Sequence, residues 1–212
     1  MYDTIFIGAG YWAVGFCEAN QGKNLILSDS VYLDDFMPCM RQADASFETD
    51  LGEKMYQEFQ QSGMIRDSLV DSVQGACWLY RKAEQLNTTT ILYQTLVSEV
   101  SDHCVTIHND AGTFCLHAEQ VIDLRRQGSS YFWNILVQGE NPDCVEHFYP
   151  QFRVLHLPVE GNFVSARRQF ETYRLQHPEL RYVMGAVQLE AAGQNRSPFK
   201  CYERGFAAGV HQ

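Results

Sequence analysis

The distribution of apolar and polar residues at the start of the chain predicts a strand, a helix and a second strand. Residues 4–7 form a short apolar run that ends at Gly8, which is typical of a strand buried on both faces. Residues 11–20 carry small and apolar side chains at helical spacing, and Gly22 is a candidate for the helix stop. Residues 24–28 are a second apolar run. Elements this close together require a parallel strand pair with a right-handed crossover.

The rest of the chain shows helical and β patterns without repeats, linkers or low-complexity segments. Residues 30–48 have no clean period and are interpreted as a long loop. Helices are predicted over 50–61, 67–86 with Asp67 as N-cap, 162–176 and 202–210. Strands are predicted over 90–95, 96–100, 104–108, 113–117, 120–124, 131–137, 153–157 and 182–188, with a turn at 109–112. These patterns indicate the α/β class, in one continuous domain over residues 1–212, with a parallel sheet, a β-meander crossover and flanking helices.

The turn between the first strand and the first helix has the spacing of a dinucleotide-binding site. Gly8, Gly10 and Ala13 fill the pattern G-x-G-x-x-G/A. The first glycine permits a tight turn, the second lets the backbone approach a pyrophosphate, and the small third residue lets helix and strand pack closely. The helix N-terminus then presents amide groups and a positive dipole end to the anion. Asp29 follows the second strand, where a carboxylate accepts hydrogen bonds from ribose hydroxyls.

The order of elements after the second helix resembles the FAD-dependent oxidoreductase family. The segments that carry the resemblance are ILYQTLVSEV, CVTIHNDAG and HAEQVIDLRRQG, together with LPVEGNFVSARRQF and the closing YERGFAAGV. The resemblance implies a Rossmann-like FAD-binding fold and a flavin-dependent redox activity. It also implies that Val97 contacts adenine through its backbone, and that Gly8, Gly10 and Asp29 hold the pyrophosphate and ribose.

The sequence departs from that family on the side of the flavin ring. LRRQG stands where the family has ATGDG, so only Gly128 remains of its glycines, and no Gly-Asp pair occurs near the C-terminus. Arg125 and Arg126 could replace lost phosphate contacts, or be a solvated pair at a strand end. Arg41, in the bulky segment VYLDDFMPCMRQ, could also reach the phosphates or lie on the surface. The candidate cofactor-binding residues are Gly8, Ala9, Gly10, Tyr11, Trp12, Ala13, Asp29, Ser30, Arg41, Val97, Arg125 and Gly128.

Two features of the candidate site leave alternatives open. Tyr11 and Trp12 are unusually large for a glycine turn, and they either cover the adenine or pack in the core. Cys39 could face a flavin as a redox thiol, although a plain loop cysteine is the simpler interpretation. The histidines of the meander, His103, His108 and His117, do not predict a metal site, because His103 and His108 point to opposite faces of a regular strand.

Composition narrows the class of partner. The net charge of −10 argues against nucleic acid and against an anionic membrane. Seven cysteines, an odd number without a C-x-x-C pair, indicate reduced thiols and a cytoplasmic location. The start of the chain lacks the pattern of a signal peptide, and no apolar stretch approaches the roughly 20 residues that span a bilayer.

The leading hypothesis is therefore a small FAD-binding oxidoreductase whose ligand is a small-molecule dinucleotide. The main alternative is a non-catalytic, degenerate flavoprotein homologue that binds ADP, FAD or a partner chain, and the missing glycines favour it. A third interpretation, an NAD-binding module, is disfavoured by the meander that precedes VID. Neither a homo-oligomer nor a partner subunit is decided by the sequence, and no residue is assigned a catalytic role.

Overall fold

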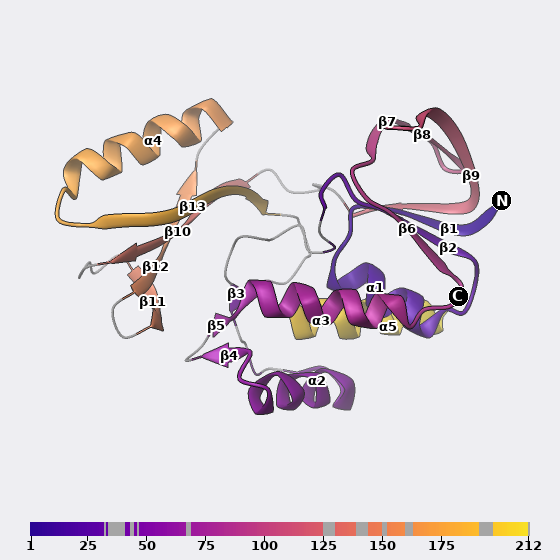
Figure 1. The fold of residues 1–212 in the computed structure, drawn as a ribbon, viewed down its shortest axis with the longest axis horizontal. Coiled ribbons are helices and arrows are strands. Elements are labelled where there is room, and N and C mark those ends of the chain that lie inside the picture. The colour runs from indigo at the N-terminus through magenta and orange to yellow at the C-terminus, as the bar shows by residue number, and fades with distance from the viewer. Residues whose placement is uncertain are drawn as a thin grey trace.

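The largest of the sheets among the described residues has six strands and lies on the right in Figure 1. The computed structural model describes residues 1–31, 33, 41–42, 45, 47–66, 69–124, 130–138, 144–149, 152–159, 163–190 and 197–211. The strand order is β6 (Thr89–Leu92), β2 (Asn24–Leu27), β1 (Tyr2–Ile7), β9 (Gly112–Asp123), β8 (Cys104–Asn109) and β7 (Leu96–Val100). The first four are parallel, and β7, β8 and the start of β9 form an antiparallel meander. The predicted α/β class is confirmed, with two predicted strands joined into the single long β9.

Alternate side chains of the central strands build two cores, one on each face of the sheet. Phe6 and Ile26 belong to a large cluster formed with the helices. Ile5 and Ile7 point to the other face, where they join a smaller cluster that includes Val105 and Ile107 of the meander. Because both faces are covered, β1 and β2 have the near-continuous apolar sequences of buried parallel strands.

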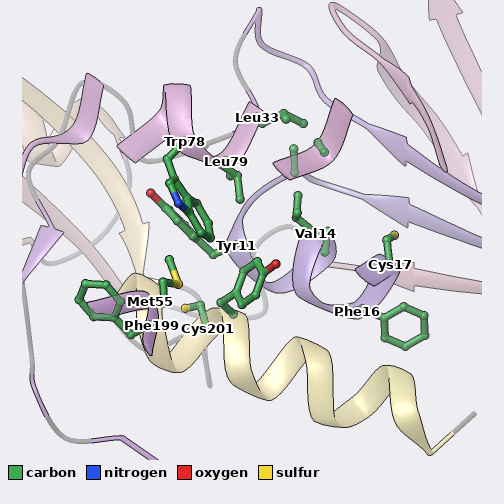
Figure 2. Packing of buried hydrophobic residues seen from close by; sticks show 14 of the residues in the cluster. Tyr11, Val14, Phe16, Cys17, Leu33, Met55, Trp78, Leu79, Phe199 and Cys201 are labelled. Carbon is green, nitrogen blue, oxygen red and sulfur yellow. The ribbon is translucent and has the colours of Figure 1, made fainter. Parts of the chain in front are cut away.

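Four helices lie on one side of this sheet in Figure 1. They are α1 (Tyr11–Ala19), α2 (Asp50–Gln61), α3 (Ser72–Glu84) and α5 (Pro198–Val210). The bounds of α2 are those predicted, and α5 begins earlier than predicted because Pro198 occupies its first turn, where proline is favoured. Figure 2 shows side chains of α1, α2, α3 and α5 meeting in one aromatic-rich core.

Helices α1 and α5 approach each other closely because glycines stand where they meet. A Cβ added to Gly205 would lie 2.8 Å from the carbonyl carbon of Trp12, and one added to Gly15 would lie 3.1 Å from that of Tyr202. Gly209 faces Phe16 one turn further along α5. Backbone therefore packs directly on backbone, and α1, which carries the glycine turn, is held in place by α5.

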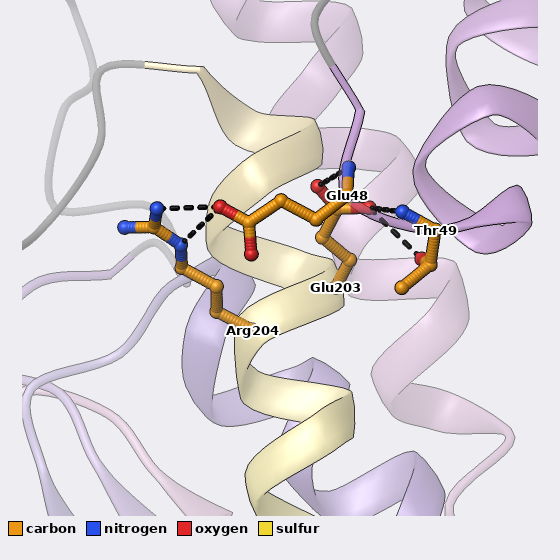
Figure 3. Close-up of polar contacts among 4 residues, drawn as sticks. All are labelled: Glu48, Thr49, Glu203 and Arg204. Carbon is orange, nitrogen blue, oxygen red and sulfur yellow. Dashed lines mark hydrogen bonds and ion pairs between the residues drawn. The ribbon is translucent and has the colours of Figure 1, made fainter.

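A buried carboxylate joins α5 to the start of α2 (Figure 3). Glu203 is only 2% exposed. Its two carboxylate oxygens accept hydrogen bonds from the backbone amides of Glu48 and Thr49, at 2.9 and 3.0 Å, and from the Thr49 hydroxyl at 2.9 Å. Next to it, Arg204 donates two hydrogen bonds to the exposed carboxylate of Glu48. Glu203 thus satisfies amide groups at the N-terminus of α2 that the helix itself leaves unpaired.

A second, antiparallel sheet forms a separate lobe. Its four strands are ordered β11 (Cys144–Tyr149), β12 (Phe152–Val159), β10 (Ser130–Gln138) and β13 (Arg181–Glu190). Helix α4 (Phe163–Gln176) lies over this sheet (Figure 1). The sequence predicted three of these strands and the helix, but not β11. A smaller three-stranded sheet contains β3 (Arg41–Gln42), β5 (Leu69–Val70) and β4 (Ile65–Arg66).

Two local predictions were wrong. Helix α3 begins after Asp71, whose side chain accepts from the amides of Val73 and Gln74, so Asp67 is not its N-cap. Helix α1 ends at an extended Asn20, so Gly22 does not end it. Among the described residues, no helix is long and apolar enough to cross a bilayer.

The expectation of reduced thiols was also wrong for one pair of cysteines. Cys104 and Cys115 form a disulfide across β8 and β9, with their Cα atoms 6.6 Å apart. The free cysteines among the described residues are Cys17, Cys77 and Cys201. Sequence spacing could not reveal the bonded pair, because only the strand register brings the two residues together.

Candidate dinucleotide-binding site

The glycine turn lies where the carboxyl ends of three parallel strands meet. The amide of Gly8 donates to the carbonyl of Leu27 at the end of β2, at 2.9 Å. The amide of Leu124, just after β9, donates to the carbonyl of Ile7 at 2.8 Å. Gly8 has φ 96° and Gly10 has φ 140°, which are conformations that residues with a Cβ rarely adopt. The turn therefore needs glycine at both positions for its own backbone as well as for any ligand.

The N-terminus of α1 is open to an anion. Gly10 is the N-cap and has no side chain, and no side-chain hydrogen bond caps this helix. The amide of Val14 donates to the carbonyl of Gly10 at 3.1 Å, so an α-helix starting here leaves the amides of Trp12 and Ala13 without partners inside the helix. Among the described residues, a Cβ built on Gly10 would meet only the carbonyl oxygen of Leu33, at 3.9 Å. No side chain of the described residues thus lies within 4 Å of this position, at the positive end of the helix.

The acidic residue predicted to bind ribose lies beside this turn. Asp29 is exposed and follows the buried Ser28 at the end of β2. Ser28 donates its amide to Leu92 of β6 and accepts from the amide of Thr95, both at 2.9 Å. The carbonyl of Ser30 accepts from the amide of Gln94 at 3.1 Å.

These bonds fasten the segment between β6 and β7 against residues 28–30. Val97, the second residue of β7, follows two residues after Thr95 and is partly buried in the smaller core. The fold therefore brings Gly8, Gly10, Asp29, Ser30 and the start of β7 to one edge of the sheet. The roles that the resemblance gives these residues stay predictions.

The side chains of the three residues after Gly10 pack in the hydrophobic core. Tyr11 is 2% exposed and stacks on Trp78 of α3, with ring centroids 6.3 Å apart (Figure 2). Trp12 packs against Phe6 and Phe16, at 6.1 and 5.6 Å between centroids. Ala9 and Ala13 are buried in the same core cluster. Of the two alternatives for Tyr11, packing is the one observed.

Several candidates fall outside what the structure describes. Arg125, Arg126, Gly128 and Cys39 are not among the described residues. Arg41 is described only through its backbone, which pairs with Val70 in the small sheet. Their proposed contacts with phosphate or flavin remain untested predictions.

Sequence reasoning missed a cavity of about 490 Å³ beside α3. Its lining includes Leu33, Met64, Ala76, Cys77, Tyr80 and Arg81. Leu33 links this cavity to the glycine turn, because its carbonyl oxygen is the nearest atom of the described residues to a Cβ built on Gly10. The volume is in the range of small-molecule pockets, and no periodic pattern in α3 distinguishes such a lining from an ordinary partly exposed helix face.

Comparison with known proteins shows which solved structures have a similar fold. No protein-family model matches the sequence, and no curated protein sequence matches it either. Solved structures do match. The anhydrotetracycline hydroxylase OxyS from Streptomyces rimosus has a TM-score of 0.58 and 11% identity over 89% of this chain. A myxobacterial chondrochloren halogenase, described as a variant of FAD-dependent halogenases, has a TM-score of 0.59 and 11% identity over 99% of this chain.

The fold is the one seen in FAD-dependent hydroxylases and halogenases. A flavin-dependent brominase shares it as well, with a TM-score of 0.62 and 9% identity over 99% of this chain. The resemblance predicted from the sequence is thereby confirmed for the fold. The chain spans 52% of the length of the OxyS structure, 71% of the chondrochloren halogenase and 79% of the brominase.

Proposed function

We propose that this chain binds FAD, mainly through its ADP half, and acts as a flavin-dependent oxidoreductase on a small molecule. The observation that carries the proposal is the open glycine turn. Gly8 and Gly10 hold positive φ angles in front of an uncapped helix N-terminus, at the carboxyl ends of parallel strands. In open α/β sheets, ligands bind outside these strand ends. The solved structures that share the fold include a hydroxylase in complex with FAD and aklavinone.

The described residues fit the ADP half of FAD. The backbone of Gly8 and Gly10 and the first-turn amides of α1 would hold the pyrophosphate, since a glycine at the second position of such a turn lets the backbone approach it closely. The exposed carboxylate of Asp29 would accept hydrogen bonds from ribose, and the backbone of Val97 would contact adenine. FAD would supply reversible two-electron redox chemistry, while the protein binds and orients it.

A second candidate function is binding of ADP or FAD without catalysis. It is favoured by LRRQG at the place of the family's ATGDG. Flavin-dependent consumption of a nicotinamide reductant, measured with the FAD-loaded protein, separates the two. Turnover above that of free FAD supports the oxidoreductase, and a bound flavin that does not turn over supports the non-catalytic function.

The binding proposal is tested by titrating FAD against the parent and two aspartate variants, with quenching of flavin fluorescence as the signal. Asp29→Ala is expected to weaken FAD binding by about 1.5–3 kcal/mol, roughly 10- to 150-fold, the range for hydrogen bonds to a charged group. Asp102→Ala is the matched control, because it removes the same charge from an exposed site between β7 and β8. Equal losses in both variants would mean that Asp29 acts only through net charge.

A further inference from the structure

The outer face of the meander brings two sulfur atoms and one imidazole together. Cys104 of β8 lies directly opposite His117 of β9 in the strand register. Cys115 is two residues before His117, so its side chain points to the same face of the sheet. The Sγ of Cys115 is 3.7 Å from Nε2 of His117, and the ligand atoms of all three residues lie within 4.8 Å of one another.

The three side chains are accessible to solvent, and the opposite face of the same hairpin is buried. Cys115 and His117 are exposed and Cys104 is half-buried. On the opposite face of β8, Val105 and Ile107 are buried, at 0% and 1% exposure, in the smaller core. The hairpin is therefore anchored on its inner face, while the sulfur and imidazole groups face solvent.

The other two histidines of the meander have different surroundings. Nδ1 of His103 lies 2.8 Å from the backbone carbonyl of Glu119. The two ring nitrogens of His108 lie 2.8 Å from the hydroxyls of Thr113 and Ser98. His117 differs from both because its Nε2 is directed at a sulfur atom.

We propose that Cys104, Cys115 and His117 form a redox-dependent site for a thiophilic divalent metal ion, namely Zn²⁺. In the oxidised state the two sulfurs form the disulfide, and no thiolate is present to bind metal. A dithiol reductant transfers two electrons and two protons to the disulfide, which gives two thiols and leaves the reductant as a disulfide. Binding of Zn²⁺ then releases both thiol protons, and two thiolates, the imidazole and one water complete a tetrahedral site.

The geometry agrees with this ligand set. Zinc–sulfur and zinc–nitrogen bonds of about 2.3 and 2.0–2.1 Å at the tetrahedral angle place sulfur and nitrogen about 3.6 Å apart. The observed distance between Sγ of Cys115 and Nε2 of His117 is 3.7 Å. The S–S bond has to open, and the strand ladder already places the three side chains on one face.

The proposed metal site is distinct from the glycine turn. Cys115 lies near the start of β9 and Asp123 at its end, a separation of about 26 Å at roughly 3.3 Å per residue. The metal site therefore does not depend on FAD binding, and each proposal can fail without the other.

The test is a Co²⁺ titration of the protein before and after reduction with a dithiol that is then removed without oxygen. A Cys77→Ser background removes an exposed free thiol that could bind metal on its own. We expect the reduced protein to bind one Co²⁺ with a thiolate-to-cobalt charge-transfer band, and Zn²⁺ to abolish that band. The oxidised protein should show no band.

Two histidine variants make the assignment specific. His117→Ala should weaken Co²⁺ binding at least tenfold, while His108→Ala on the same hairpin should bind as the parent does. The proposal is overturned if the reduced protein binds no Co²⁺, if the oxidised protein binds it equally well, or if His117→Ala binds as tightly as His108→Ala. In any of these cases the cysteine pair is a structural crosslink only.

Discussion

Substituting Gly205 by alanine tests the close packing of α5 on α1. The added Cβ would lie 2.8 Å from the carbonyl carbon and 3.0 Å from the Cα of Trp12. Carbon atoms in ordinary contact are about 3.5–4.0 Å apart, so the helices would have to separate by about 1 Å. The obstacle is the backbone of a buried helix, which cannot move aside as a flexible side chain can.

The magnitude follows from two opposing effects. Overpacking of this kind costs up to about 3 kcal/mol, while alanine in a helix gains about 1 kcal/mol over glycine. The net expectation is a loss of about 2 kcal/mol in the free energy of unfolding. For a chain of this size it corresponds to a fall in Tm of about 4–8 °C. Because α1 carries the glycine turn, FAD affinity should fall as well.

Thermal and urea unfolding followed by circular dichroism measure the effect. Ala207→Ser is the matched control, since it adds one atom on the exposed face of the same helix, and it should change stability by no more than about 0.5 kcal/mol. If Gly205→Ala is as stable as the parent or more stable, the two helices are not in backbone contact and the proposed support of the turn is wrong.

Three further predictions concern buried groups. Glu203→Ala should destabilise the fold by about 2–4 kcal/mol in urea unfolding, because it leaves the amides of Glu48 and Thr49 unpaired. Glu48→Ala is the control: it removes only a solvent-screened ion pair with the exposed Arg204, so the free energy of unfolding should change little. Burial raises the pKa of Cys17 from 9.0 to about 12, so the unfolded chain ionises first and stability should fall by about 1.4 kcal/mol per pH unit between those values. Cys17→Ala should flatten that slope, and an unchanged slope would refute the assignment. In thiol labelling of the native protein at pH 8, the exposed Cys77 should react much faster than Cys17.

The parts of the fold that the sequence predicted well have strong local signals. The apolar run before Gly8, the spacing of Gly8, Gly10 and Ala13, and Asp29 after the second run predicted β1, α1 and β2 in their observed places. The turn before Gly112 was equally clear, since Asn109 accepts from the amide of Ala111 and Gly112 has φ 128°. In these segments the local pattern and the tertiary structure agree.

The parts that were missed depend on contacts between distant segments. Residues 67–71 contain two aspartates that could each cap a helix, and pairing of Leu69 and Val70 with β3 and β4 selects the later one. The disulfide depends on the register of β8 and β9. The glycines of α5 have a helical spacing of four residues, which was a usable signal of close helix packing, but nothing in the sequence named α1 as the partner.

The central claim is that an open glycine turn holds the ADP half of FAD. Its most direct test is calorimetric titration of the purified protein with FAD, ADP and FMN under identical conditions. We predict that FAD binds, that ADP competes with it, and that FMN, which lacks the adenosine, binds much more weakly. FMN binding as tight as that of FAD, or no binding of FAD and ADP, would contradict the account.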